Sequence, residues 1–399
     1  MKPHGSGDYE KTFYLRSANL ELTRRCNLRC TYCSVSQPGY RAATMSATVM
    51  ERALAGLREM KVSSVALNGH GETTTVNGWH EVIGIITQTG AQAHLTSNFA
   101  RLFTEEELDA MLGLTSVVVS LDTDDAELLR RTRRSVDLRI ILENLYRLQR
   151  AAARRCVRGP QLLASCVVHT HNVMHLDRLV RFCLARGVGG FDFCNLTKNP
   201  DLPGALNVDH VTSLPPEELS AAYWKLVEAK GIAYSRGASC EIQSGLLDSI
   251  ASALKASDGS AWAALQTKKR YFAQPDSGQT RRCLDPWLYA LIQADGSVNP
   301  CCWHPPVGSL EAAPLKAVLN DEPVLKLRRQ LMSGELCEPC RTCPAKPATR
   351  LDAFEQVLRR QVPRSRLGGS VRRTGISAKH YLRRHGIAPP ADWRRIAAI

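Results

Sequence analysis

The fold is decided by one stretch near the N-terminus, Ala18-Asn19-Leu20-Glu21-Leu22-Thr23-Arg24-Arg25-Cys26-Asn27-Leu28-Arg29-Cys30-Thr31-Tyr32-Cys33. Its first part, Ala18–Thr23, predicts a strand, and three cysteines then follow in the spacing C-x3-C-x2-C: Cys26, Cys30 and Cys33. Three thiolates on one short loop suit a [4Fe–4S] cube, because the irons of such clusters take cysteine ligands. One iron is then left without a protein ligand and is open to chelation by a small molecule. A structural zinc site would normally show four ligands.

Outward from this stretch, short apolar runs alternate with helical patterns up to about residue 196. The clearest strand is Val117–Leu121, whose apolar composition is typical of a strand buried on both faces. Ser46 predicts the N-cap of the first helix. The predicted strands span residues 18–23, 62–67, 93–97, 117–121, 162–169 and 190–196, and the predicted helices span 46–60, 79–89, 138–153 and 175–186, with a further helix starting at 104.

Six β/α units in this order imply a parallel sheet with right-handed crossovers. Six units are too few to close an eight-stranded barrel. The predicted fold class is therefore α/β, an open partial (β/α)6 TIM-like barrel followed by a small cysteine-rich domain with a β-hairpin and a helix. In barrels of this kind the chemistry sits at the C-terminal ends of the strands.

The composition is that of a globular protein, with 44% hydrophobic and 23% charged residues. No run of 18 apolar residues predicts a membrane helix, and the polar N-terminus lacks the apolar segment of a secretory signal, so we expect a cytoplasmic protein. Of the formal net charge of +14, residues 350–399 supply nine, with 12 basic and 3 acidic residues. We expect five segments: an N-terminal extension (1–16), the barrel (17–200), a helical connector (201–280), the cysteine-rich domain (281–348) and a basic tail (349–399).

Nine of the 14 cysteines fall in two groups, which in a reducing compartment indicates metal or redox chemistry rather than disulfides. Asp295-Gly296 predicts a tight hairpin between residues 288–293 and 297–299. Two cysteines across this hairpin and a C-x2-C some 35 residues later make a four-ligand set, for which zinc remains an alternative. The cysteines of this second group are Cys283, Cys301, Cys302, Cys337, Cys340 and Cys343.

With these motifs, residues 17–200 resemble the radical S-adenosylmethionine (AdoMet) superfamily. Gly69-His70-Gly71-Glu72 after the second strand is similar to the family's Gly-Gly-Glu element, which holds the AdoMet amino group, although His70 stands where glycine is more usual. A glycine lets the backbone approach closely and a carboxylate pairs with the ammonium. The resemblance also implies ribose and methionine contacts from Ser97, Asn98, Ser120 and Asp122, and a partner for the AdoMet carboxylate in Arg133 or Arg134.

This resemblance implies a chemistry as well as a fold. The reduced cluster, with AdoMet chelated at its open iron, would cleave AdoMet to methionine and a 5′-deoxyadenosyl radical, which abstracts a hydrogen atom from a C–H bond. The barrel would exclude water and hold the substrate carbon close, so that positioning carries much of the catalysis. The implied cofactors are a [4Fe–4S] cluster with an open iron site and AdoMet. Flavodoxin or ferredoxin would supply electrons.

The second cysteine group resembles the SPASM/twitch auxiliary-cluster domains that follow many radical AdoMet barrels. Its run is C-x2-C-x2-C and no cysteine follows Cys343, whereas the full SPASM form carries a longer run and a further distal cysteine. This departure favours the shorter twitch form with one auxiliary [4Fe–4S] cluster. The preferred ligand set is Cys283, Cys301, Cys337 and Cys340, with Cys343 as the substitute. A second auxiliary cluster would need an open site or an outside ligand.

Two substrate classes remain open. The twitch spacing resembles that of cyclitol dehydrogenases of aminoglycoside pathways, which implies a small polyhydroxylated substrate, a sugar or aminocyclitol, and either oxidation of an alcohol or epimerisation. Cys302, Cys194 and Cys166 are candidate hydrogen donors for epimerisation, and His169, His171 and Glu72 are conceivable, unranked bases. The alternative is a maturase that crosslinks or epimerises a ribosomally made peptide. The short segment before the first strand leaves no room for a peptide-recognition domain and so disfavours this alternative.

The arginine-rich tail has two interpretations. It is either a solvated or packed extension or a site for a phosphorylated substrate, since arginine matches phosphate with two parallel hydrogen bonds. Nucleic acid is not an expected partner of the tail.

Overall fold

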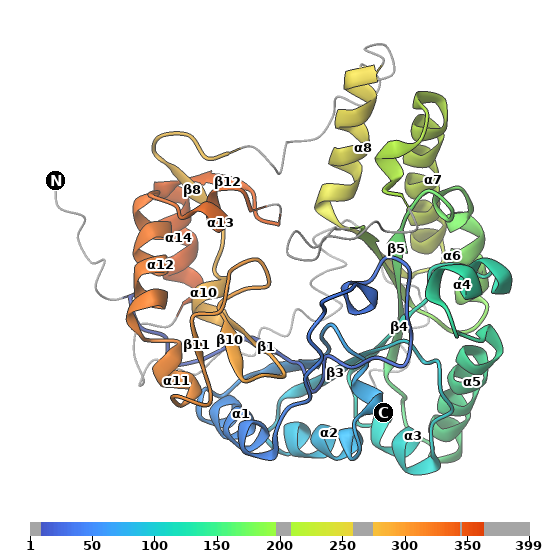
Figure 1. Ribbon diagram of the computed structural model, residues 1–399, viewed down its shortest axis with the longest axis horizontal. Coiled ribbons are helices and arrows are strands. Elements are labelled where there is room, and N and C mark those ends of the chain that lie inside the picture. Colours follow the sequence, from blue (N-terminus) through green and yellow to red (C-terminus); the bar gives the residue numbers. More distant parts are fainter. Residues whose placement is uncertain (1–8, 197–208, 258–273, 344, 363–399) are drawn as a thin grey trace, which may run out of the picture. The chain divides into compact units, whose positions relative to one another are not determined.

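Ten strands of the computed structural model form one sheet in the order β11-β10-β9-β1-β2-β3-β4-β5-β6-β7, drawn in Figure 1. The structure describes residues 9–196, 209–257, 274–343 and 345–362. The parallel strands are β1 (Ser17–Leu20), β2 (Ser64–Leu67), β3 (Gln92–Ser97), β4 (Ser116–Ser120), β5 (Gln161–Val168), β6 (Gly190–Asn195), β7 (Ser239–Ile242) and β9 (Tyr289–Ile292). The antiparallel ones are β10 (Ser297–Asn299) and β11 (Gly308–Ser309), and β12 (Ala348–Arg350) pairs with β8 (Gln279–Arg281) in a separate ladder.

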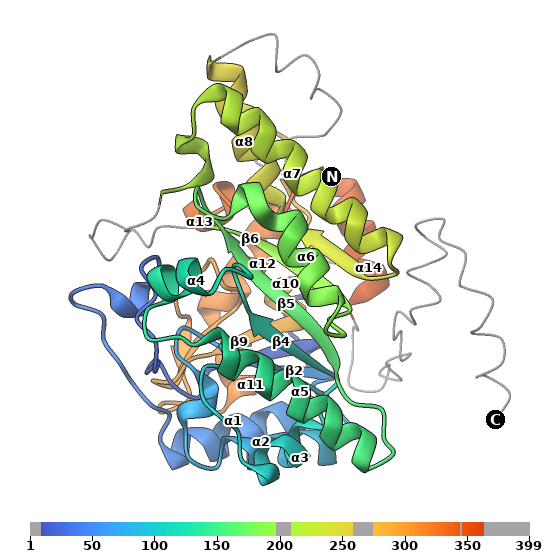
Figure 2. The ribbon, with the colours of Figure 1, turned by 90° about the vertical axis from the view of Figure 1, so that its right-hand side faces the viewer.

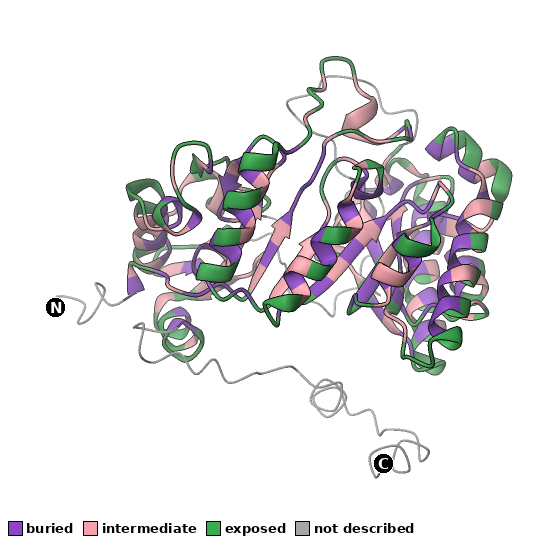
Figure 3. Ribbon diagram, turned by 90° about the horizontal axis from the view of Figure 1, so that it is seen from below, coloured by how far each residue is buried: buried purple, intermediate pink, exposed green. Residues whose placement is uncertain are grey.

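Helices cover the outer, convex face of this sheet and leave its inner face open (Figures 1 and 2). Their buried residues face the strands and their exposed residues face outward, as Figure 3 shows by colour. Around the barrel they are α1 (Ala47–Glu59), α2 (Trp79–Gln88), α3 (Glu105–Met111), α4 (Ala126–Arg133), α5 (Leu138–Arg154), α6 (Leu176–Leu184), α7 (Pro216–Ser235) and α8 (Ser244–Ser257). The C-terminal part adds α10 (Asp285–Leu288), α11 (Leu315–Val318), α12 (Glu322–Ser333), α13 (Glu338–Arg341) and α14 (Leu351–Gln361).

Alternation along the strands separates a core face from a concave face. In β5, Leu162, Ala164, Cys166 and Val168 are buried, and the intervening residues from Leu163 to Val167 are only half-buried. Every second residue therefore packs against the helices, and the others face the inner side of the sheet. The same pattern holds in β1 and β2, so the concave face is a surface on which side chains from many strands can meet one molecule.

Local capping signals account for several helix starts. Ser46 accepts a hydrogen bond from the Val49 amide at 3.3 Å, which confirms the predicted N-cap of α1. Thr104 and Glu107 form a reciprocal capping box at the start of α3. These caps satisfy amide groups that the first turn of a helix leaves unpaired.

The open α/β barrel predicted from the sequence is confirmed, and the sheet is wider than predicted. Strand β7 continues it after β6, and β9 of the cysteine-rich part pairs in parallel with β1. The cysteine-rich part thus extends the barrel sheet itself. Its predicted hairpin forms between β9 and β10, with Gly296 at a φ of +81°, a value that favours glycine.

The start of the predicted basic tail is a packed helix. Within α14, Phe354 and Leu358 are buried, and the Phe354 ring lies 6.1 Å from that of Trp287. The arginines predicted to contact phosphate beyond residue 362 lie outside the described residues, as do parts of the N-terminal extension and the connector. No described helix is both long and apolar enough to cross a membrane.

Candidate functional site

The three-cysteine loop follows β1 and is anchored against the C-terminal end of α4. The Thr31 amide and hydroxyl both donate to the Thr132 carbonyl, at 2.8 and 3.1 Å. The Cys26 sulfur accepts the Leu28 amide at 3.4 Å. Burial raises the pKa of the Cys30 thiol to about 12, so iron binding at this loop must displace its proton.

Two glycines allow the loop after β2 to approach this cysteine loop closely. A Cβ atom on Gly71 would lie 2.3 Å from the carbonyl oxygen of Thr23, and one on Gly69 would lie 2.4 Å from the Glu21 side chain. Neither position has room for a side chain. The glycines predicted from the AdoMet resemblance are therefore required here by contact with β1 and the residues that follow it.

Glu72 lies at the heart of this loop and is 4% exposed. One carboxylate oxygen accepts the amide and hydroxyl of Thr74, at 3.1 and 2.8 Å, and the other accepts the Asn98 amide at 2.7 Å. These bonds orient the carboxylate that the resemblance assigns to the AdoMet amino group. That assignment remains a prediction.

His70, where the family more often has glycine, ties the two loops together. Its Nδ1 lies 3.2 Å from the Ser34 hydroxyl, directly after the last cysteine of the motif. Its backbone amide donates to Glu21 at 2.7 Å. Glu21 also accepts the Ala294 amide and Arg24 Nε, both at 3.1 Å. A single buried carboxylate thus joins the glycine loop to the β9–β10 hairpin.

Asp122 and Arg133 form a buried ion pair beneath the cysteine loop. Arg133 donates to both oxygens of Asp122, at 2.7 and 2.9 Å. The Tyr32 hydroxyl and the Val167 amide also donate to this carboxylate. Burial by itself would raise the pKa of Asp122, but the Arg133 charge and these hydrogen bonds outweigh it and hold that pKa below its usual range. The structure therefore pairs with each other the two residues predicted to contact the ribose and the carboxylate of AdoMet.

The remaining predicted contacts lie at the same end of the strands. Ser97 is buried and its hydroxyl accepts the Phe99 amide at 3.1 Å, whereas Asn98 donates to Asn27 within the cysteine loop at 2.8 Å. Ser120 is half-buried on the concave face of β4. Asn98 therefore contacts the cysteine loop and Ser120 lies on the open face of the sheet. The Ser97 hydroxyl instead bonds to the backbone of the turn that follows β3.

Unpartnered polar atoms also gather near this loop. Among the described residues, the buried Nε2 of His169 and the buried hydroxyls of Ser36 and Tyr40 have no hydrogen-bond partner. The His171 amide donates to Nδ1 of His169, so the neutral ring carries its proton on Nε2. Buried donors of this kind call for a bound polar group. Together with three thiols on one loop and close-packed glycines, they fit a cluster and AdoMet.

The second cysteine group surrounds a small void. Cys283, Cys301, Cys340 and Cys343 all line a space of about 20 Å³. Arg281 fixes the backbone on either side of Cys343, because it donates to the Cys340 carbonyl and the Lys346 carbonyl at 3.0 and 3.1 Å. Four cysteines that line one space are the type of ligand that an iron–sulfur cluster takes, although no three ligating side chains of the described residues converge as they would on a single metal ion. Cys337, preferred over Cys343 from the sequence, is not among the lining residues, but its side chain is hydrogen-bonded to that of Cys340.

The three cysteines predicted as hydrogen donors fall in different places. Cys166 is 1% exposed and lies on the core face of β5. Cys302 is exposed and lines a larger cavity beside the auxiliary cysteines. Cys194 lies on the concave face of β6, with its sulfur 3.4 Å from the Ser165 hydroxyl and 3.5 Å from the Asp192 carboxylate.

Cys194 belongs to a polar row on the concave face. Ser120, Ser165, Asp192 and Glu241 are register partners from β4 to β7. Partial desolvation raises the pKa of Asp192; the Cys194 hydrogen bond opposes this shift and the charge of Glu241 adds to it. Burial and the neighbouring Asp192 raise the pKa of Cys194 to about 12, so this sulfur carries its hydrogen at neutral pH.

Comparison with known proteins agrees with this geometry. The Radical SAM superfamily model matches residues 20–182, and the SPASM model, an iron–sulfur cluster-binding domain, matches residues 283–344. The protein is a radical AdoMet enzyme with a C-terminal SPASM domain. Its cofactors are the radical AdoMet [4Fe–4S] cluster, AdoMet and an iron–sulfur cluster bound by the SPASM domain.

Curated relatives of this radical AdoMet enzyme include GTP 3′,8-cyclases. That of Mycolicibacterium smegmatis is 30% identical over 176 residues, 42% of this chain and 46% of the relative. That of Rhizobium etli is 26% identical over 231 residues, 56% of this chain and 62% of the relative. The chain therefore spans about half to three fifths of the length of these two relatives.

Solved structures share the fold of the radical AdoMet enzyme. Streptococcus suis SuiB bound to S-adenosylmethionine has a TM-score of 0.59 at 15% identity, covering 85% of this chain and 74% of its own. The enzyme anSMEcpe with bound AdoMet has a TM-score of 0.53 at 17% identity, covering 84% and 88%. At these identities the likeness concerns the fold alone.

Sequence reasoning missed Glu21, Arg24 and Asp192. Glu21 and Arg24 stand inside the stretch that predicts the first strand and the cluster loop, but their partners come from the distant β9–β10 hairpin. Asp192 lies in a predicted strand as a charged residue between Phe191 and Phe193. A charge alternating with buried aromatic residues is the signal that could have placed it on the open face.

Proposed function

We propose that this radical AdoMet enzyme acts on a small polyhydroxylated molecule, a sugar or aminocyclitol, and either oxidises one of its alcohols or epimerises a carbon, as an oxidoreductase or isomerase of secondary-metabolite (antibiotic) biosynthesis. The observation that carries this proposal is the polar row from Ser120 through Ser165 and Asp192 to Glu241. Hydroxyl and carboxylate groups at successive register positions match a ligand that carries several hydroxyl groups.

The chain's own residues divide the work. Cys26, Cys30 and Cys33 would hold the first cluster, and the loop ending in Glu72 would bind the amino group of AdoMet. When bound, these cofactors supply a radical that takes a hydrogen atom from carbon, and the auxiliary cluster supplies a place for one electron. Asp192, whose pKa is raised, is placed to accept the proton of a substrate hydroxyl.

For epimerisation, Cys194 is the sulfur on the concave face that would return a hydrogen atom. Its hydrogen bonds with Ser165 and Asp192 fix the direction of the thiol. Cys302 is the second candidate because it lines the cavity beside the auxiliary site. Cys166 would need a route through the core face of β5.

For the auxiliary site we propose a single [4Fe–4S] cluster held by Cys283, Cys301, Cys340 and Cys343, since these line one space. The enzyme needs a reductant, and we assign this role to flavodoxin or ferredoxin in the cytoplasm. A second substrate candidate is a peptide, because SuiB has been solved with its precursor peptide SuiA and anSMEcpe with the peptide Cp18Cys.

The test compares the two substrate classes directly. Reconstituted enzyme is incubated anaerobically with AdoMet, a reductant and either a panel of sugars and aminocyclitols or a panel of peptides, and 5′-deoxyadenosine is quantified. We expect formation above the substrate-free rate only with the polyhydroxylated panel, and at least a tenfold loss in Asp192→Asn. Stimulation by peptides alone would overturn the proposal. Glu143→Gln, an exposed change on the outer helix α5, is the matched control.

A further inference from the structure

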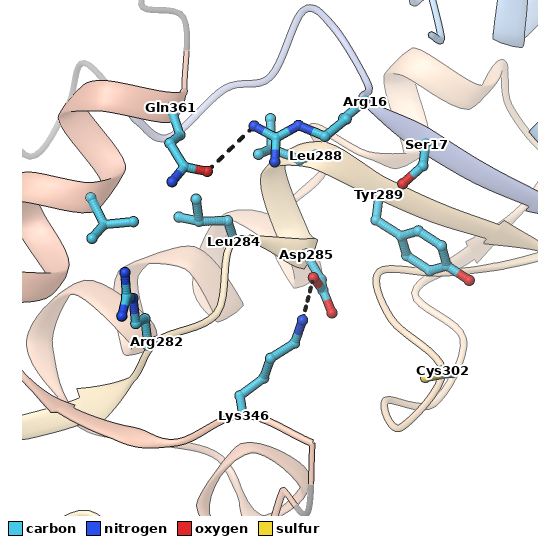
Figure 4. A pocket seen from close by; sticks show the side chains of 11 residues that line it. Arg16, Ser17, Arg282, Leu284, Asp285, Leu288, Tyr289, Cys302, Lys346 and Gln361 are labelled. Carbon is cyan, nitrogen blue, oxygen red and sulfur yellow. Dashed lines mark hydrogen bonds and ion pairs between the residues drawn. The ribbon is translucent and has the colours of Figure 1, made fainter. Parts of the chain in front are cut away.

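A cavity of about 430 Å³ lies beside the auxiliary cysteines (Figure 4). It shares Asp285 and Lys346 with the wall of the smaller void that the four cysteines line. Ser17 of β1 and Tyr289 of β9, which are register partners, form another part of its wall. The cavity therefore extends from the N-terminal ends of β1 and β9 to the auxiliary site, and its volume falls in the range of about 300–1,000 Å³ typical of small-molecule sites.

The charges around this cavity do not balance. Arg16, Arg282 and Lys346 line it together with a single carboxylate, Asp285. Lys346 Nζ lies 3.0 Å from that carboxylate, and Figure 4 shows this ion pair among the lining side chains. Lys346 therefore neutralises Asp285, and the positive charges of Arg16 and Arg282 have no carboxylate partner among the residues that line the cavity.

Both arginines have hydrogen-bond donors to spare. Arg16 is exposed, and its one side-chain hydrogen bond to a described residue is a long contact of 3.4 Å with Gln361. Arg282 is also exposed, and its guanidinium group has no hydrogen-bond or ion-pair partner within the described part of the chain. A guanidinium group offers five donors in a planar fork that matches phosphate and carboxylate oxygens.

We propose that this cavity binds the anionic group, a phosphate or carboxylate, of the substrate. The inference rests on the proposed function in taking the small substrate as the occupant, and it narrows that substrate to a polyhydroxylated molecule that bears an anion. Arg16 and Arg282 would bind the anion, and Tyr289 lines the same cavity. The substrate would thereby be oriented with one end beside the auxiliary site.

The test measures anion binding by the reconstituted full-length enzyme, without turnover. Isothermal titration calorimetry is carried out with inorganic pyrophosphate and, separately, with citrate, on wild type, Arg16→Gln and Arg282→Gln. Arg150→Gln is the matched control, since Arg150 is an exposed arginine on the outer helix α5. We expect saturable binding by wild type and a loss of about tenfold or more in each cavity variant, the size of one charge-assisted hydrogen bond, but not in the control.

Binding of pyrophosphate alone would assign a phosphate, and binding of citrate alone a carboxylate; either supports the site. Absence of saturable binding of both anions, or an equal loss in Arg150→Gln, would overturn it. Phenylglyoxal labelling read by mass spectrometry gives a second readout, in which the anion should protect Arg16 and Arg282. If the anions bind in a way that depends on Arg16 and Arg282 but no sugar or aminocyclitol is turned over, the anion site is supported and the proposed function is wrong. The failure of one proposal can therefore be distinguished from the failure of the other.

Discussion

Replacing Glu21 by glutamine tests whether one buried carboxylate holds the glycine loop Gly69–Glu72 to the β9–β10 hairpin. One oxygen of Glu21 accepts the His70 amide at 2.7 Å, and the other accepts the Ala294 amide and Arg24 Nε, both at 3.1 Å. A glutamine side chain offers one oxygen and one NH2 group. In either orientation the NH2 group faces a buried backbone donor, so one loop loses its acceptor.

The size of the effect follows from these contacts. An unpaired buried donor costs about 1–3 kcal/mol, and loss of the Glu21 charge weakens a pair with Arg24 that is largely shielded from water. Arg24 keeps a second ion pair, with Asp295 at 3.0 Å, which limits the loss. We therefore expect the free energy of unfolding to fall by about 3 kcal/mol. Because His70 belongs to the glycine loop, AdoMet affinity should fall by about tenfold as well.

Two measurements check this prediction. Urea unfolding of the cluster-free protein gives the change in stability, and anaerobic titration of the reduced enzyme with AdoMet, followed by EPR, gives the affinity. Glu143→Gln removes an exposed carboxylate of α5 and should stay within about 0.5 kcal/mol of wild type. If Glu21→Gln matches this control in both measurements, the carboxylate does not link the two loops and the argument fails.

Three further predictions follow from the site. Cys343→Ser should lose about four irons per chain while Cys337→Ser keeps them; the reverse result would return Cys337 to the ligand set. In Gly71→Ala, a Cβ placed 2.3 Å from a carbonyl should abolish the AdoMet-induced change in the EPR signal although iron is retained, and an unchanged response would contradict this. Burial lowers the pKa of His169 from 6.5 to about 4, so the unfolded chain binds the extra proton and stability falls as the pH drops from 6.5 to 4. The free energy of unfolding, measured by urea denaturation, should fall by about 3 kcal/mol more over that pH window in wild type than in His169→Phe. An equal fall in the two proteins would refute this prediction.

The strand and helix pattern of the barrel was predictable because it is local. Apolar runs, the Ser46 cap and the capping box at Thr104 are all written within a few residues of the element they start. Strand β7 was missed because it has four residues, with an exposed Glu241 among them, and gives no clear periodic signal. The parallel pairing of β9 with β1 joins residues about 270 positions apart, so no window of sequence contains both partners.

The candidate site divides in the same way. Cys26, Cys30 and Cys33 lie within eight residues and define their chemistry by spacing alone. For the auxiliary site, spacing predicts a group of six cysteines, but the choice between Cys337 and Cys343 as a ligand depends on which thiols turn toward one space. The orientation of these thiols depends on tertiary contacts such as those of the buried Arg281, which no spacing rule contains.

The SPASM strands extend the barrel sheet, and this geometry bears on how the two halves could work on one substrate. The cysteine loop leaves β1 at its C-terminal end, whereas the cavity beside the auxiliary site lies at Ser17, where β1 begins. One strand therefore separates the radical source from the auxiliary site, and Glu21 closes the same strand onto the hairpin. A substrate lying along the concave face could reach both ends at once, with its anion near Arg16 and its reacting carbon near the cysteine loop. Moving the hairpin by breaking the Glu21 contact should then impair the coupling of AdoMet cleavage to substrate more than cleavage itself.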